Sequence, residues 1–263
     1  MLQDKTQIER RIFLIQYLIS ENPRYKEIVI PQNEVEQKQL LRSLMNVRPA
    51  KNASEEFFNV QNAYLIEENK RRGITNISDL KPICDDFYLW RGDITTLKIG
   101  AIVNAANSGM TGCYQPCHSC IDNCIHTFAG IQLRAECAKI MEAQGHEEPT
   151  GQAKITKAFN LPCDFVLHTV GPIVGSSLSE NDCRLLSSCY TSCLDLANKN
   201  VIESIAFCCI STGVFRFPHE KAAEIAVSTA QEWKNSTKSK MKILFNVFSE
   251  KDEKIYKQLF PNR

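Results

Sequence analysis

From residue 87 onward, short apolar runs alternate with longer stretches that have helical periodicity. The runs expected as strands are residues 87–90, 101–104, 165–170, 204–210 and 242–247. Among and after them, residues 121–144, 182–199, 218–234 and 250–259 carry apolar side chains at helical spacing. Strands that alternate with helices form a mainly parallel sheet with helices on both faces. The pattern therefore predicts a three-layer α/β/α domain over residues 81–263.

Residues 1–80 have a different pattern, without strand-like runs. Isoleucines recur at helical spacing in the first stretch: Ile8, Ile12, Ile15 and Ile19. Two more periodic stretches cover residues 35–47 and 54–70, and Ser54 is a suitable cap for the second of them. We expect residues 1–80 to form a helical N-terminal extension. This extension could cover the sheet, act as a lid or dock a substrate.

Composition narrows the class of protein. At 263 residues with 43% hydrophobic side chains, the chain can bury a sizeable core. Its 31 basic and 30 acidic side chains give a net charge of +1, so nucleic acid is not an expected partner. No stretch resembles a secretory signal or reaches the roughly 20 apolar residues of a membrane-spanning helix. We expect a cytoplasmic protein that binds no membrane, is monomeric by default and keeps its twelve cysteines reduced.

Small and polar residues end three of the apolar runs. They occupy residues 92–95 (Gly-Asp-Ile-Thr), 103–107 (Val-Asn-Ala-Ala-Asn) and 211–215 (Ser-Thr-Gly-Val-Phe). Ligands of parallel sheets bind beyond the carboxyl ends of the strands, where these segments would lie. The third segment suits a phosphate group, because small residues let backbone N–H groups face an anion and Pro218 then opens a helix.

Taken in order, these segments resemble the macrodomain family, whose members bind ADP-ribose. The resemblance continues through residues 150–153 (Thr-Gly-Gln-Ala), 168–172 (His-Thr-Val-Gly-Pro) and 222–225 (Ala-Ala-Glu-Ile), and covers about residues 87–262. It implies a mixed, mainly parallel sheet and an ADP-ribose cleft. The residues that it implies at the ligand are Asp93, Ile94, Asn104, Asn107, Gly171, Ser211, Thr212, Gly213, Val214, Phe215 and Arg216.

The resemblance also divides the ligand among these residues. Asp93 would accept a hydrogen bond from the adenine amino group, and Gly171 and residues 211–216 would enclose the diphosphate. Asn104 and Asn107 would reach toward the distal ribose. For strand-end asparagines, turn formation through side chain to backbone bonds is the alternative interpretation.

A dense group of cysteines and histidines occupies residues 112–126. Thiolate and imidazole are preferred zinc ligands, and catalytic zinc is commonly held by three protein groups. We expect Cys113, His118 and Cys120 to bind zinc, although Cys117 could also chelate. Six further cysteines and His126 are expected to pack in the core; the cysteines are Cys124, Cys183, Cys189, Cys193, and Cys208 with Cys209 in a strand.

The loop departs from the usual hydrolytic macrodomains, which carry glycines before a Gly-Val-Asp sequence. Residues 120–122 (Cys-Ile-Asp) stand in that place, so Asp122 takes the position of the catalytic aspartate. The chain is thus similar to the zinc-containing branch of the family, which is linked to sirtuin-type ADP-ribosyltransferases. This similarity implies a zinc-dependent hydrolase that removes mono-ADP-ribose from protein carboxylates, with Asn107, Asp122 and Asn104 as catalytic candidates. A lipoyl-carrier protein is one candidate substrate.

Three alternatives stay open. A binding module could read ADP-ribose without hydrolysing anything. The zinc could be a structural clip, for which Cys117 would supply a fourth ligand. A nicotinamide-dependent oxidoreductase would share the α/β pattern, but the Gly-x-Gly-x-x-Gly sequence is missing after the first strand.

Overall fold

The computed structural model describes residues 5–260. Residues 1–4 of the expected helical extension and residues 261–263 of the expected α/β domain lie outside the described residues. The described helices are α1 (Gln7–Ser20), α2 (Glu34–Val47), α3 (Glu55–Arg71), α4 (Ile121–Ala129), α5 (Ile131–Gln144), α6 (Glu180–Lys199), α7 (His219–Thr237) and α8 (Glu250–Gln258). The strands are β1 (Thr75–Asn76), β2 (Phe87–Arg91), β3 (Leu97–Lys98), β4 (Ala101–Ala106), β5 (Ala153–Lys157), β6 (Phe165–Val170), β7 (Ser204–Phe207) and β8 (Lys242–Val247).

A six-stranded sheet with the order β2-β8-β7-β4-β6-β5 forms the centre of the fold. All neighbours in it are parallel except β5, which runs antiparallel to β6. The prediction of a mixed, mainly parallel sheet is confirmed. Strand β5 was not predicted, because it lies at the sheet edge and only Thr156 of its five residues is buried, so no apolar run marks it.

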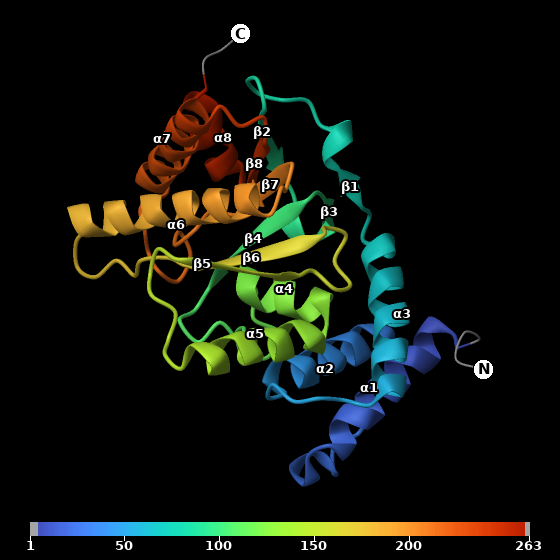
Figure 1. Cartoon of the computed structure of the whole chain (residues 1–263). Coiled ribbons are helices and arrows are strands. Elements are labelled where there is room, and N and C mark those ends of the chain that lie inside the picture. Colours follow the sequence, from blue (N-terminus) through green and yellow to red (C-terminus); the bar gives the residue numbers. More distant parts are fainter. Residues whose placement is uncertain (1–4, 261–263) are drawn as a thin grey trace.

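Helices cover both faces of this sheet (Figure 1). Helices α6 and α7 pack against each other on one face, and α8 packs against α7, β2 and β8. Helices α4 and α5 cover the other face, and α2 and α3 pack against α4 from outside. The three-layer α/β/α architecture is therefore as predicted, with the N-terminal helices added beyond one helical layer.

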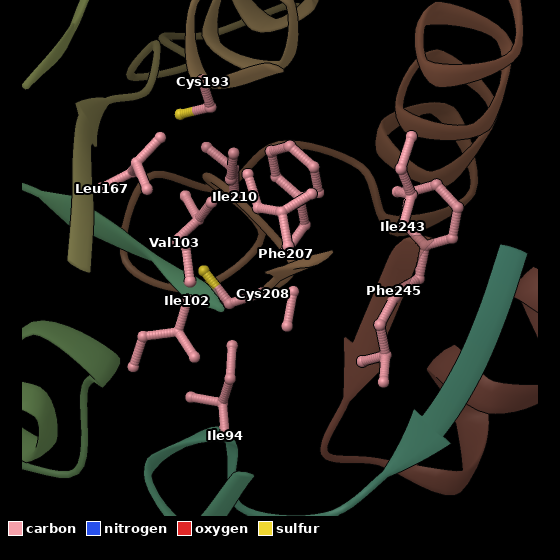
Figure 2. Packing of buried hydrophobic residues seen from close by; sticks show 14 of the residues in the cluster. Ile94, Ile102, Val103, Leu167, Cys193, Phe207, Cys208, Ile210, Ile243 and Phe245 are labelled. Carbon is pink, nitrogen blue, oxygen red and sulfur yellow. The ribbon is translucent and has the colours of Figure 1, made fainter. Parts of the chain in front are cut away.

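The core lies between the sheet and its helices. Phe207, Ile243 and Phe245 pack with side chains from β4 and β6, as Figure 2 shows. Cys193 and Cys208 belong to the same cluster, in agreement with the expectation that these cysteines are core residues. All twelve cysteines are free.

Two predicted elements are shorter than expected. The stretch 121–144 is two helices, because Gly130 has a φ of +97° and ends α4. A Cβ at this glycine would lie 2.7 Å from Nε2 of Gln61, which belongs to α3. The predicted strand 204–210 ends at Phe207, so Cys208 and Cys209 lie beyond the strand rather than in it. The chain leaves the sheet there to enter a loop in which Ser211 has a φ of +65°.

The N-terminal helices have an apolar cluster of their own. Leu14, Ile15 and Leu18 of α1 pack with residues of α2 and α3, and Ile131 of α5 joins the cluster. The predicted isoleucine stripe is only partly correct, since Ile8 is 60% exposed. The third helix begins as predicted, because Oγ of Ser54 accepts a hydrogen bond from the N–H of Phe57. Among residues 5–260, we find no helix with the length and apolarity needed to cross a membrane.

Candidate active site

Most of the predicted ligand residues lie at one edge of the sheet. Strands β2, β8, β7, β4 and β6 are parallel, so their carboxyl ends share this edge. Backbone hydrogen bonds join the segments at this edge in two pairs. The N–H of Gly92 donates to the carbonyl of Val247, and the N–H of Val174 donates to the carbonyl of Phe215.

Asp93 follows β2 at this edge. Its Oδ1 accepts hydrogen bonds from the N–H of Thr95 at 2.9 Å and from its hydroxyl at 2.6 Å. Its Oδ2 is paired with the guanidinium of Arg72, and 41% of the side chain is exposed. Ile94, by contrast, is 1% exposed and packs in the core.

Residues 211–216 form a tight loop after β7. Ser211 and Arg216 both have positive φ values, of 65° and 58°, which non-glycine residues seldom adopt. The N–H of Phe217 donates to the carbonyl of Ser211, and the N–H of Arg216 donates to that of Gly213. Val214 is exposed and Phe215 is half-buried. The loop thus exposes Gly213, Val214 and Arg216 and keeps Ser211 buried.

Gly171, at the end of β6, lies against this loop. A Cβ there would fall 2.0 Å from Oγ of Ser211, so only glycine permits this approach. The hydroxyl of Ser211 is buried and has no hydrogen-bond partner. A buried polar group without a partner is costly unless a ligand or water satisfies it. Together with the loop conformation, this hydroxyl suits an anionic group.

Asp122, in the first turn of α4, is held by both strand-end asparagines. The amide of Asn104 donates to Oδ1 at 2.8 Å, and the amide of Asn107 donates to Oδ2 at 3.3 Å. Asn104 is fully buried behind the carboxylate, whereas Asn107 is exposed. Of the two, Asn107 is therefore the one that can touch a ligand, and Asn104 holds Asp122.

Burial also changes the acidity of this carboxyl. Asp122 is 5% exposed, and loss of hydration raises its pKa to about 6. The amide of Asn104 and the positive charge of Arg134 act in the opposite direction. Perturbed carboxyls of this kind gather at catalytic sites.

The predicted metal ligands lie together just before α4. The donor atoms of Cys113, His118 and Cys120 all lie within 4.8 Å of one another. Burial raises the pKa of Cys120 to about 12, so a cation that binds there must displace the thiol proton, which is released to solvent. Two thiols and one imidazole match the donor types and the number that a catalytic zinc site requires. The residues present therefore fit the metal.

Cys117 lies outside this group. Its Sγ is 3.2 Å from Oγ of Ser43 and 3.4 Å from the carbonyl of Gln39, both on α2. Its φ of 53° turns the side chain toward that helix. In this arrangement the loop offers three ligands rather than four.

Comparison with known proteins finds relatives over nearly the whole chain. The Macro domain model matches residues 103–226. The protein-ADP-ribose hydrolase of Treponema medium is 66% identical over 258 residues, which cover 97% of this chain and 99% of that protein. The enzyme of the same name from Staphylococcus aureus (strain MSSA476) is 48% identical over 252 residues, 94% of each chain.

The chain belongs to the macrodomain family. The prediction that it is an enzyme is confirmed by these two relatives, which it matches over nearly its full length. A macrodomain of Trypanosoma brucei, solved in complex with ADP-ribose, is 28% identical to this chain and superimposes on it with a TM-score of 0.62. The match covers 97% of this chain and 90% of the Trypanosoma chain. The macrodomain fold is therefore confirmed as well.

Two residues of the present chain that lie near Asp93, at the carboxyl ends of β2 and β8, were not predicted from the sequence. Arg72, which follows α3, pairs with Asp93, and its guanidinium carbon lies 3.5 Å from the ring centre of Phe128. Phe248 follows β8 and is 83% exposed. The strand-end rule could have found Phe248, but no local signal marks Arg72.

A second group of possible ligands lies inside the macrodomain: His126, Cys137 and His168. Both ring nitrogens of His168 are already engaged, one with the amide of Asn104 and the other with the hydroxyl of Thr156. His126 packs 3.6 Å from Oδ1 of Asp122 and is buried, in line with its expected packing role. This group therefore supports Asp122 and the core rather than a second metal.

Proposed function

We propose that the protein is a zinc-dependent hydrolase that removes mono-ADP-ribose from carboxylate side chains of proteins. Removal of ADP-ribose from proteins is the activity for which its relatives from Treponema medium and Staphylococcus aureus are named. The observation that carries the zinc proposal is the convergence of Cys113, His118 and Cys120 beside Asp122. The linkage proposal comes from the resemblance described above, as does a lipoyl-carrier protein as one substrate.

The edge of the sheet supplies the binding site for ADP-ribose in this proposal. Asp93 would accept a hydrogen bond from the adenine amino group in exchange for part of its contact with Arg72. The exposed ring of Phe248 offers a flat apolar surface for the purine. Ser211 and the loop to Arg216 would hold the diphosphate through backbone N–H groups and the unpaired hydroxyl.

Asp122 and Asn107 act at the distal ribose. Hydrolysis of the ester adds the hydroxyl of water to ADP-ribose and releases the side chain as a carboxylate, with one proton passed to solvent. Asp122 orients the water or accepts its proton, because its two oxygens are fixed by Asn104 and Asn107. Zinc held by the loop would supply a Lewis acid that polarises an oxygen at the scissile bond.

The test uses a protein that carries mono-ADP-ribose on a carboxylate side chain. Release of ADP-ribose is followed with native enzyme, chelator-treated enzyme, chelator-treated enzyme given zinc again, and the Cys120→Ala variant. Cys117→Ala is the matched control, because its thiol is in the same loop but outside the ligand group. We expect zinc to restore the treated native enzyme, Cys120→Ala to stay slow, and Cys117→Ala to match the native rate.

Other outcomes would change the proposal. Equal rates with and without metal would remove zinc from the mechanism. Binding of ADP-ribose without release by any sample would leave a binding module. Parallel substrates modified on serine or arginine test the linkage, and equal or faster release from them would contradict the preference for carboxylates.

A further inference from the structure

Helix α2 forms one wall of the metal-binding loop, defined here as residues 112–120. The guanidinium of Arg42 donates from Nη2 to the carbonyl of His118 at 2.7 Å and to Oδ1 of Asn123 at 2.9 Å. One side chain of α2 thus holds the backbone of a predicted ligand and the first turn of α4 together. Cys120, the other ligand in this part of the loop, is the N-cap of the same helix.

Asn46, one turn further along α2, holds the middle of the loop. Its Oδ1 accepts a hydrogen bond from the N–H of Cys117 at 2.9 Å, and its amide donates to the hydroxyl of Thr127 at 2.9 Å. Cys117 has a positive φ, and non-glycine residues keep this conformation only when the surroundings impose it. The contact with Asn46 helps to impose it and turns the Cys117 side chain away from the ligand group.

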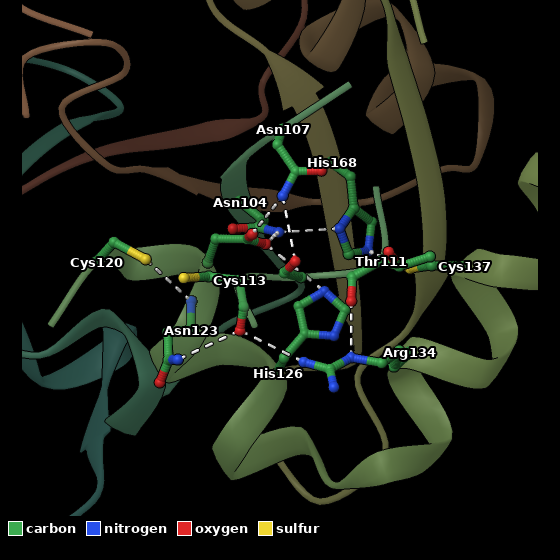
Figure 3. Close-up of polar contacts among 12 residues, drawn as sticks. Asn104, Asn107, Thr111, Cys113, Cys120, Asn123, His126, Arg134, Cys137 and His168 are labelled. Carbon is green, nitrogen blue, oxygen red and sulfur yellow. Dashed lines mark hydrogen bonds and ion pairs between the residues drawn. The ribbon is translucent and has the colours of Figure 1, made fainter. Parts of the chain in front are cut away.

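The beginning of the loop is tied to the end of α2 by a buried arginine. Arg134 of α5 donates to the carbonyls of Asn46 and Arg48 at 2.7 and 2.5 Å, which terminate α2. It also donates to the carbonyl of Thr111 at 2.7 Å and to that of Cys113 at 3.5 Å (Figure 3). Both ends of the loop are therefore held against α2.

We propose that Arg42 is a positioning residue of the zinc site and that α2, far from being a detachable cover, keeps His118 and Cys120 in register with Cys113. The inference rests on the zinc proposed above. Partners that orient metal ligands typically contribute about 10- to 100-fold to metal affinity. Arg42 is suited to this role, since both hydrogen bonds come from Nη2 and a planar guanidinium fixes the direction of its N–H groups, whereas the donors of a lysine ammonium rotate freely.

The test measures zinc affinity of the full-length chain by competition with a chromophoric chelator. Arg42→Met keeps the side-chain length and removes the donors, and we expect a loss of about 10- to 100-fold in affinity. Arg42→Lys should give a smaller loss. Lys38→Met is the matched control, because Lys38 lies one turn earlier on α2 and, among residues 5–260, its ion pairs are with Glu34 and Glu68 rather than with the loop. It should bind zinc as the native chain does.

ADP-ribose binding by the zinc-free proteins separates positioning from folding. A native-like dissociation constant for Arg42→Met would show that the fold is intact while the metal is lost, and if this variant does not fold, Arg42→Lys carries the comparison. Equal zinc affinity of Arg42→Met or Arg42→Lys and the native chain would overturn the inference alone. Absence of zinc binding by the native chain would overturn the metal site itself, and this inference with it.

Discussion

Asn104 donates its side-chain amide to Oδ1 of Asp122 at 2.8 Å in the interior of the domain. The same amide lies 3.1 Å from Nδ1 of His168. This buried arrangement links the end of β4 to the first turn of α4, so the carboxylate has a fixed direction before any ligand arrives. Because folding already fixes the orientation of this carboxylate, it does not have to be ordered again during the reaction.

Replacement of Asp122 should slow release with little effect on binding. Positioned proton-transfer groups contribute about 100- to 10,000-fold, and we expect Asp122→Ala to lower kcat within that range. Single-turnover release and calorimetry with ADP-ribose, run side by side, separate the two effects. A native rate from Asp122→Ala would contradict the role given to this residue.

Replacement of Asp93 should have the opposite profile. Hydrogen bonds to a charged group contribute about 1.5–3 kcal/mol, so Asp93→Ala should weaken ADP-ribose binding by roughly 10- to 150-fold. Asp86→Ala is a matched control, since Asp86 precedes β2 at its other end and pairs with Lys234. Calorimetry measures the ADP-ribose affinity of both variants. Equal affinities of Asp93→Ala and Asp86→Ala would show that Asp93 does not contact the ligand.

A methyl group at Gly171 should disturb the proposed phosphate loop. Its Cβ would meet Oγ of Ser211 at 2.0 Å and Cγ2 of Ile210 at 2.8 Å. Overpacking costs about 1–3 kcal/mol, and because the loop must move away from the new methyl group, Gly171→Ala should weaken ADP-ribose binding by about 5- to 150-fold. Gly175→Ala is the control, because nothing lies within 4 Å of its Cβ. The double change of Gly171→Ala with Ser211→Gly should recover part of the affinity if the clash is the cause.

His168 should make the fold sensitive to acid. Burial lowers the pKa of His168 to about 3, against about 6.5 in an unfolded chain, so between these values only the unfolded state is protonated. The contribution of His168 to the free energy of unfolding is fully present above about pH 6.5. Below that pH, the free energy of unfolding falls by up to about 1.4 kcal/mol per pH unit. His168→Gln should flatten this slope in urea unfolding between pH 7 and pH 4. His146→Gln, at an exposed position, controls for the loss of a histidine; an unchanged slope in His168→Gln would assign the acid sensitivity elsewhere.

The predicted strands and the ligand segments at their ends illustrate what local sequence encodes. Strands β6 and β8 were predicted to the residue, because each is an apolar run buried on both faces of the sheet. Asp93, Asn107 and Ser211 follow such runs, so topology brings them to one edge. The edge strand β5 was not predicted because it lacks an apolar run, and the break at Gly130 was not predicted because it brings that residue against Gln61 and Asn160, which are distant in the chain.

The sequence by itself determined the parallel sheet, the segments at its ligand-binding edge and the donor types before α4, because periodicity, strand ends and side-chain chemistry are local properties. Only the tertiary structure decided that Cys117 faces α2 while Cys113, His118 and Cys120 converge. It also decided that Arg42, of α2, reaches the loop of residues 112–120 and that Arg72, after α3, reaches Asp93. Those contacts join residues far apart in sequence, and they depend on how the helices pack rather than on any pattern along the chain.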